Sequence, residues 1–363
     1  MFRETAQLAL LPETSAFDVF AAPRLEAKGV ATALPVTYAD ILLGCGYRET
    51  ERLTSLLEGW RSLFERWKPD LVVADYAPTA LLAARTLGIR RVAYGNGFFI
   101  PPRKSPLPPF RIDEPVDPRG VAAADAAVLE SVNGALARIG AAPLERLEQM
   151  FDSDEDFLCT FPELDHYGVR DSSGYWGPRL RTDLGNVVDF PKGPGKRVFV
   201  YVKTSMPNLE MLLEVLAARP HRVLAFIPGL SAHQRSQLAS PARRVVDRPV
   251  RMDTAFRDCD LLVSHGGEMA GGAACAGVPT LLFPSHYEQF LLALRLQQLG
   301  IGTWLRMDSS RAEIAAAMDA QLGDRHVADR AQLFSTRYSA YSPREQRRRI
   351  VSRIEELLAA PPA

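Results

Sequence analysis

The chain has 363 residues, 47% of them hydrophobic and 24% charged, which is typical of a globular protein large enough for two domains. Lys and Arg together number 43, as do Asp and Glu, so a net charge of zero gives no general reason to expect nucleic acid or an anionic membrane as partner. No apolar run approaches the ~20 residues of a membrane span, and the first fifteen residues do not resemble a signal peptide. The four cysteines form no metal-like spacing, so we expect reduced thiols, no metal site and a cytoplasmic protein.

The first half of the chain alternates short apolar runs with helical patterns, which is typical of an α/β domain with a parallel sheet. The proline-rich segment 100–116 is expected to be a stiff surface loop that lines a site. Strands are predicted at 17–22, 70–76, 91–96 and 156–161, and helices at 48–67, 78–88, 118–140 and 143–151.

The second half repeats this alternation after a loop-rich segment, 162–195, which we interpret as a hinge. An amphipathic helix at 342–360 ends the chain. We therefore predict two doubly wound, Rossmann-like domains facing across a cleft, divided into residues 1–190, 191–340 and 341–363. The strands of the second domain are predicted at 196–202, 221–229, 243–247, 259–267, 278–284 and 301–305.

One of these strands ends in His265-Gly266-Gly267 at the point where a helix should begin. Backbone N–H groups and the positive end of the helix dipole suit a phosphate there, and the glycines allow a diphosphate to approach closely. The histidine can donate one more hydrogen bond. Glu288 and Gln289 follow the next strand, where a carboxylate and an amide can hold neighbouring sugar hydroxyls. Together these residues predict a nucleotide-sugar site, although His-Gly-Gly alone is also typical of a tight turn.

The order of these motifs resembles that of the GT-B glycosyltransferases, specifically the bacterial relatives of UDP-glucosyltransferases, most clearly over 255–305. The resemblance implies an inverting, metal-independent hexosyltransferase without a cofactor. Its donor would be a UDP- or TDP-linked sugar, and its acceptor the hydroxyl of a small, partly hydrophobic molecule. The motifs concerned are His265-Gly266-Gly267, Gly277-Val278-Pro279, Pro284, Glu288-Gln289, Ala293 and Gly300-Ile301-Gly302.

The resemblance also implies roles for individual residues and segments. His265, Gly266 and Gly267 would hold the donor diphosphate, and Glu288 and Gln289 the transferred sugar. Ser205 would lie near the phosphates and Val250 near the base. Residues 1–190 would be the acceptor-side domain and 191–340 the donor-binding domain, with the helix in 341–363 crossing back to the first.

The turn departs from the family pattern at Glu268, where the family usually has Gly-Thr or Asn-Ser after the two glycines. The hydroxyl that bonds phosphate is lost, and a carboxylate stands near an expected dianion. Like charges disfavour binding unless the carboxylate turns to solvent. The other interpretation is that Glu268 simply occupies the first helical turn, facing water and favoured by the helix dipole.

The first domain departs from the family at its start, where a strand and a loop carrying the catalytic histidine are expected. Asp75 fits the aspartate that orients this base, but no histidine precedes His166, so we expect a shortened first domain. Asp75 has alternative interpretations as a helix N-cap or a surface residue, and His166 as a loop histidine or a substitute base. An open sheet edge predicts either a homodimer or cover by residues 1–11.

Two other functions stay open. A non-catalytic nucleotide-sugar-binding or partner protein with a degenerate GT-B fold would explain the missing histidine and the altered turn. A nucleotide-sugar epimerase of the same fold would need further acidic bases in the cleft.

Overall fold

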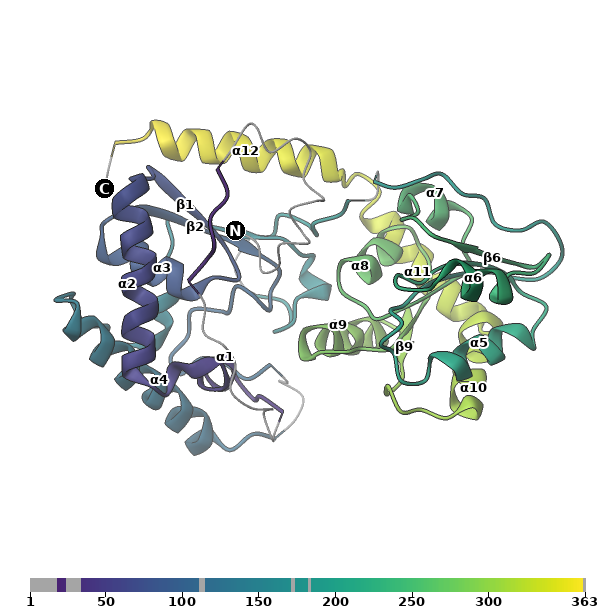
Figure 1. Ribbon diagram of the computed structural model, residues 1–363, viewed down its shortest axis with the longest axis horizontal. Coiled ribbons are helices and arrows are strands. Elements are labelled where there is room, and N and C mark those ends of the chain that lie inside the picture. The colour runs from purple at the N-terminus through teal and green to yellow at the C-terminus, as the bar shows by residue number, and fades with distance from the viewer. Residues whose placement is uncertain (1–17, 24–33, 111–114, 171–173, 182–183, 362–363) are drawn as a thin grey trace. The chain divides into compact units, whose positions relative to one another are not determined.

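The structure is a computed structural model that describes residues 18–23, 34–110, 115–170, 174–181 and 184–361 (Figure 1). Its contacts divide the chain into two compact units, which are described separately. Unit 1 comprises Met1–Leu158 and Ile354–Ala363, and unit 2 comprises Cys159–Arg353. Residues 159–190 thus group with unit 2, whereas the sequence analysis placed them in the first domain; the domain boundaries themselves stay a prediction.

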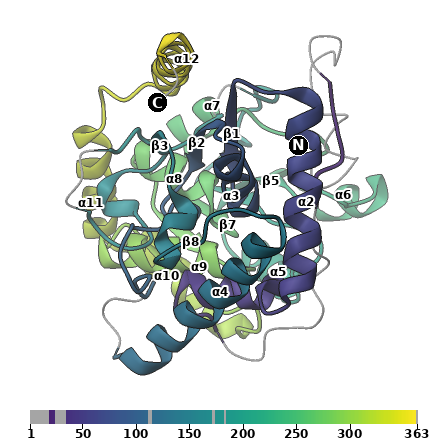
Figure 2. The same cartoon turned by 90° about the vertical axis from the view of Figure 1, so that its left-hand side faces the viewer.

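Unit 1 contains a parallel sheet, which has three strands in the described part of the chain. Its order is β1 (Leu71–Asp75), β2 (Arg90–Gly95) and β3 (Glu155–Leu158), with Asp75 paired to Tyr94 in register. Helix α3 (Pro78–Thr86) packs on β1 and β2, and α2 (Thr50–Trp67) packs on α3 and α4 (Pro118–Arg138) (Figure 2). The remaining elements are α1 (Tyr38–Leu42), η3 (Leu43–Tyr47) and η4 (Leu147–Phe151).

Local sequence explains the helices of unit 1. In α2, Leu53, Leu57, Trp60 and Phe64 recur every three or four residues, and all are buried on one face. Helix α4 begins after Asp117, whose carboxylate accepts hydrogen bonds from the next exposed backbone N–H groups, and has a proline at its first position. These signals made both helices predictable.

Two predicted elements of unit 1 are wrong. Residues 18–22, all but the first residue of the strand expected at 17–22, have no regular structure, because Phe20 packs on Trp67 (ring centroids 4.4 Å apart) instead of joining a sheet. The helix expected at 143–151 is only the 3-10 turn η4, because the side chain of Asn133 binds both backbone groups of Leu144. The segment 1–11 lies outside the described residues, and the homodimer stays a prediction.

Unit 2 contains a parallel sheet with the strand order β6-β5-β4-β7-β8-β9 over the residues that the structure describes. The order reverses between β4 and β7, as in a doubly wound sheet. With the parallel sheet of unit 1, this confirms the predicted fold class of two Rossmann-like α/β domains. The strands are β4 (Arg197–Tyr201), β5 (Arg222–Phe226), β6 (Arg243–Val246), β7 (Leu261–Ser264), β8 (Thr280–Leu282) and β9 (Gly302–Trp304).

Helices cover both faces of this sheet, so its central strands are buried on both sides and read as continuous apolar runs. In β4, Val198 and Val200 pack toward α5 and α10, whereas Phe199 packs toward α7 and α8. Each fully buried side chain of this kind stabilises the fold by about 1.5–3 kcal/mol. The helices of the unit, with one 3-10 turn, are η5 (Pro162–Leu164), α5 (Leu209–Ala217), α6 (Ala232–Leu238), α7 (Met252–Arg257), α8 (Glu268–Cys275), α9 (Tyr287–Gln298), α10 (Arg311–Gly323) and α11 (Arg325–Arg337).

The last helix, α12 (Pro343–Ala359), begins in unit 2 and ends in unit 1. In unit 2 the buried Gln346 side chain donates to the carbonyl oxygen of Gly177. In unit 1 the guanidinium of Arg90 donates to backbone carbonyls at the end of this helix, including that of Pro361 at 2.7 Å. None of the helices in the described ranges is long and apolar enough to cross a membrane.

Candidate functional site

The carboxyl ends of β4 and β7 meet where the strand order reverses, which is where doubly wound sheets bind ligands. His265 follows β7, and its side chain connects the strand ends at this point. Its Nε2 accepts a hydrogen bond from the backbone N–H of Lys203, after β4, at 2.9 Å. Its Nδ1 lies 2.9 Å from the carbonyl oxygen of Phe283, after β8. Because Nε2 accepts, the ring proton belongs on Nδ1, which donates to Phe283.

The role expected for His265 therefore differs from what the structure shows. Burial lowers the pKa of its ring, and the nearby Lys203 cation lowers it further against the opposing effect of the Phe283 carbonyl, so the neutral form is favoured. Both nitrogens are occupied by backbone groups, so in this conformation neither can donate to a diphosphate. The reason is structural: the amide after β4 lies beside β7 and takes the available nitrogen. His265 thus links the ends of three strands.

The two glycines form the turn into α8, as the sequence predicted. Gly266 has φ 107° and Gly267 has φ 66°, conformations that residues with a side chain rarely adopt. The start of α9 faces this turn. A Cβ atom at Gly266 would lie 3.5 Å from Cβ of Gln289, and one at Gly267 would lie 4.0 Å from Nε2 of Gln289. The structure thus brings together the predicted diphosphate turn and one of the two predicted sugar-binding residues.

Gln289 and Glu288 both lie in the first turn of α9. The side-chain oxygen of Gln289 accepts hydrogen bonds from the backbone N–H and the hydroxyl of Ser285, at 2.9 and 3.0 Å. This leaves its amide nitrogen directed toward the glycine turn. The buried carboxylate of Glu288 lies between two histidines, with Oε1 3.3 Å from Nε2 of His166 and Oε2 3.8 Å from Nδ1 of His286.

Glu268 is the first residue of α8, and its side chain is 52% exposed. This agrees with the interpretation of a water-facing residue in the first helical turn. The structure adds a partner that sequence patterns did not reveal. Nε of Arg179, from the loop before β4, lies 3.1 Å from Oε1 of Glu268. The carboxylate beside the turn is therefore matched by a cation.

The other predicted donor residues have different surroundings. Ser205 is exposed in the turn after β4. The side chain of Val250 is buried beside Phe256, so a contact with a base there would be made by its backbone. Burial lowers the pKa of His286 as it does that of His265. Lys203, to which the sequence analysis gave no specific role, is exposed and lies close enough to add to the lowering of both.

In unit 1, Asp75 ends β1 and is exposed. It does not cap the following helix, because the N-cap of α3 is Ala77. The next residue, Tyr76, has φ 49°, a left-handed backbone conformation that is unusual for a residue with a side chain and often marks a functional position. The exposed Tyr76 ring lies 4.5 Å, between centroids, from that of Phe99, so the acidic strand end has an aromatic neighbourhood.

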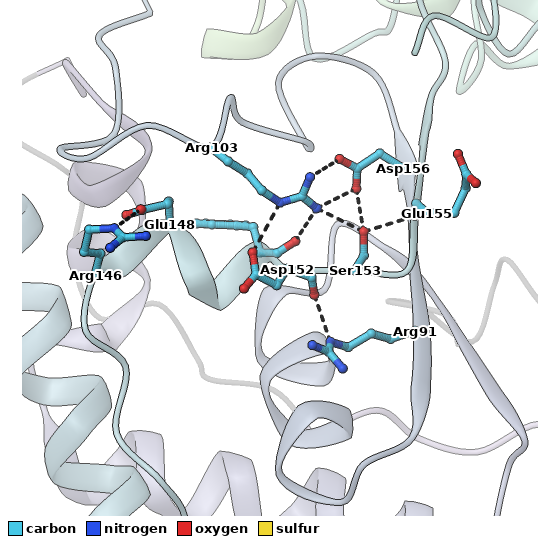
Figure 3. A network of polar contacts seen from close by, with 9 residues as sticks. Arg91, Arg103, Arg146, Glu148, Asp152, Ser153, Glu155 and Asp156 are labelled. Carbon is cyan, nitrogen blue, oxygen red and sulfur yellow. Dashed lines mark hydrogen bonds and ion pairs between the residues drawn. The ribbon is translucent and has the colours of Figure 1, made fainter. Parts of the chain in front are cut away.

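The proline-rich loop of unit 1 is held by an arginine network (Figure 3). Arg103 donates to both carboxylate oxygens of Asp156, at 2.6 and 2.9 Å, and to the carbonyl oxygen of Phe151 at 2.8 Å. Further along the loop, the backbone N–H of Leu107 donates to the buried Asp125 at 3.0 Å. The described part of this loop is therefore fixed to the body of unit 1. Nowhere in the described ranges do three or more His, Cys, Asp or Glu side chains group as a metal site.

Comparisons with known proteins agree with this fold. Residues 210–357 match the family model of the erythromycin biosynthesis protein CIII-like C-terminal domain. A PGL/p-HBAD biosynthesis glycosyltransferase of Mycobacterium tuberculosis is 25% identical over 295 residues, covering 75% of this chain and 67% of that protein. A sterol 3-beta-glucosyltransferase of Leptosphaeria maculans is 38% identical over 55 residues, covering 15% of this chain. This chain thus spans about two thirds of the first relative and only 4% of the second.

Solved structures share the two-sheet fold. The spinosyn rhamnosyltransferase in complex with thymidine diphosphate aligns with a TM-score of 0.60 and 18% identity, covering 83% of this chain and 78% of that one. Its complex with the spinosyn aglycone aligns with a TM-score of 0.59, 19% identity and the same coverage. Structural similarity at 18–19% sequence identity establishes the fold alone. The chain has the GT-B fold of these glycosyltransferase structures, and its residues 210–357 match the EryCIII-like C-terminal domain.

Proposed function

We propose that this protein transfers a sugar from a nucleoside diphosphate donor to a hydroxyl group of a small-molecule acceptor. The main observation behind the proposal is that Gln289 lies next to the glycine turn. Both lie beside the ends of the strands that His265 connects through its hydrogen bonds. The named relatives support it, since they are glycosyltransferases and a structural neighbour binds thymidine diphosphate (TDP).

On the donor side, the backbone N–H of Gly267 and the start of α8 would receive the diphosphate. The backbone N–H of Gly266, which donates to the hydroxyl oxygen of Ser264 at 3.2 Å, would exchange this partner for a phosphate oxygen. Lys203 adds a positive charge nearby, and the exposed hydroxyl of Ser205 and the backbone of Val250 are assigned to the phosphates and the base. The side-chain amide of Gln289 and the carboxylate of Glu288 would bind sugar hydroxyls, one donating and the other accepting. His265 would act by holding the ends of β4, β7 and β8 in register.

On the acceptor side, we assign Asp75 to the reacting hydroxyl. The acceptor oxygen attacks the anomeric carbon from the face opposite the diphosphate, the bond from that carbon to the diphosphate oxygen breaks, and the configuration inverts. The proton leaves the acceptor hydroxyl for the Asp75 carboxylate. Charge that develops on the departing diphosphate is stabilised by the backbone donors of the glycine turn and Lys203, without a metal ion.

The acceptor class follows from Tyr76 and its aromatic neighbours, which favour an apolar, partly planar molecule. A structural neighbour that binds a spinosyn aglycone supports an acceptor of natural-product type. The fixed proline-rich loop would line this side of the site.

The first experiment measures binding by calorimetry with TDP, uridine diphosphate (UDP) and their glucose conjugates. Gln289→Leu should lower the affinity for the glucose conjugates by about tenfold, because a hydrogen bond to the sugar is lost. Gln298→Leu, at the exposed end of the same helix, should bind as the wild type does. Failure of the wild type to bind any nucleotide would refute the donor site.

The second experiment measures product formation by mass spectrometry with the bound donor and a panel of hydroxylated aromatic and macrocyclic acceptors. A glycosylated product with an inverted anomeric centre is expected. Donor binding without any product over the panel would contradict the transferase and favour the non-catalytic alternative.

A further inference from the structure

The loop that precedes the sheet of unit 2 buries a histidine against the predicted sugar site. The His166 side chain is 2% exposed, and its Nε2 lies 3.3 Å from Oε1 of Glu288 in the first turn of α9. The backbone of the same residue is also tied to α9, because its carbonyl oxygen accepts a hydrogen bond from Arg295 at 3.1 Å. His166 is thus docked on this helix through both its side chain and its backbone.

The residue before His166 makes this docking rigid. The carboxylate of Asp165 is fully buried and accepts hydrogen bonds from the hydroxyl of Tyr175 at 3.1 Å and the backbone N–H of Tyr167 at 3.0 Å. Nε of Arg170 lies 2.7 Å from the same carboxylate. This network holds the backbone beside His166, and the hydrogen bond from Arg295 to the His166 carbonyl oxygen holds it on α9, so the ring is kept at the start of this helix.

Glu288 needs such support because its own side chain is only 10% exposed. A buried carboxylate is costly unless it is hydrogen-bonded or paired with a cation. The start of α9 supplies a favourable dipole, but a dipole does not fix the rotation of the carboxylate group. The His166 ring, 3.3 Å from Oε1, restricts this rotation and thereby directs the other oxygen.

We infer that His166 is a positioning residue for sugar recognition: it anchors Oε1 of Glu288 so that Oε2, on the side of His286, receives a hydroxyl of the donor sugar. This inference rests on the proposed function, in which Glu288 binds the sugar. It replaces the interpretation of His166 as a substitute base, since a buried ring that faces a carboxylate of its own unit is poorly placed to reach an acceptor.

The test measures the ratio of the affinity for TDP-glucose to the affinity for TDP. This ratio isolates the contribution of the sugar. His166→Leu removes the contact with Oε1, and we expect this ratio to fall by about tenfold while the affinity for TDP stays unchanged. The unchanged affinity for TDP also serves as the control for folding. His166→Gln carries an amide nitrogen near the position of Nε2 and should restore most of the ratio. His233→Leu, at an exposed position of α6, should leave it unchanged.

A double-mutant cycle separates positioning from a general structural role. Glu288→Gln should itself lower the ratio, and adding His166→Leu to Glu288→Gln should lower it no further, because His166 acts through the carboxylate. Independent, additive losses would overturn the inference, as would a His166→Leu variant whose ratio stays within twofold of the wild type. If the wild type bound neither TDP nor TDP-glucose, the proposed function would fail, and the inference with it. If the wild type binds both TDP and TDP-glucose and the His166→Leu variant has the same affinity ratio, the inference fails while the proposed function stands.

Discussion

The pair formed by Arg179 and Glu268 offers a direct test of the proposed donor site. Removing the arginine with Arg179→Ala should change the stability of the fold little. The Arg179 side chain is 18% exposed and that of Glu268 is 52% exposed, so water screens their attraction. At a separation of 3.1 Å, Coulomb attraction in water-like surroundings amounts to about 1 kcal/mol. Measured pairs with exposed partners contribute about 0–1 kcal/mol, so the free energy of unfolding should fall by no more than that.

The effect on diphosphate binding should be larger than the effect on folding. Without Arg179, the carboxylate of Glu268 would face the two negative charges of the diphosphate. Two charge pairs at roughly 6 Å in water-like surroundings repel by about 1.4 kcal/mol, which corresponds to about a tenfold loss of affinity. Glu268→Gln should have the opposite effect and tighten TDP binding by up to about tenfold. The double variant should return to within about threefold of the wild type.

The assay is calorimetric titration of TDP at low and high ionic strength, accompanied by urea unfolding of each variant. The differences between variants should shrink in high salt, because salt screens charges near the surface. Arg348→Ala is the control, since it breaks an ion pair with Glu345 in α12, away from the glycine turn. If Arg179→Ala bound TDP within twofold of the wild type at low salt, the diphosphate would not lie beside Glu268, and the assigned donor site would be wrong.

Three further predictions concern the strand ends. In urea titration, Gly266→Ala should lower the free energy of unfolding by about 1–3 kcal/mol, because φ 107° is strained for alanine, and it should also weaken TDP binding. The control Gly271→Ala, inside α8 with open space around it, should be neutral or slightly stabilising. Because burial lowers the pKa of His265 from its ordinary value of 6.5, its contribution to stability is fully present above that pH and is lost as the pH falls toward the lower pKa of the folded state. Urea unfolding at pH 7.5 and 5.5 should therefore show a smaller loss of stability for His265→Asn than for the wild type, and an equal loss would contradict the buried, neutral ring. Asp75→Asn should reduce turnover by about a hundredfold or more with unchanged affinity for TDP, whereas Asp70→Asn, just before β1, should remain active; an active Asp75→Asn variant would remove Asp75 from the mechanism.

The fold was largely predictable because its determinants are local. Strands buried on both faces read as continuous apolar runs, and the turns between them carry glycine or proline, so the six strands in the described residues of unit 2 lie within predicted ranges. The failure at 17–22 shows the limit of this signal. An apolar run becomes a strand only if a neighbouring strand is available, and in this chain Phe20 finds the ring of Trp67 instead.

The site was predictable only in part. The glycine turn and Gln289 are recognisable because their spacing along two neighbouring strands is fixed by the sheet. The hydrogen bonds of His265 were not, because both of its partners are backbone groups, which carry no sequence signal. Arg179 and His166 were missed as partners of Glu268 and Glu288, since nothing in a sequence shows which distant loop residue meets a given carboxylate.

Those two omissions have a common origin that changes how the departure at Glu268 is understood. Arg179 and His166 both come from the stretch between β3 and β4, and each meets one acidic residue at the start of a helix, Glu268 in α8 and Glu288 in α9. The charge at these helix starts is therefore set jointly by the motif and by this loop. A glutamate in place of a phosphate-binding hydroxyl is unfavourable when the motif is considered alone, but it is balanced when Arg179 is included. Whether such a turn can accept a diphosphate thus depends on a loop residue that the motif does not contain, and the Arg179 and Glu268 variants separate these two contributions.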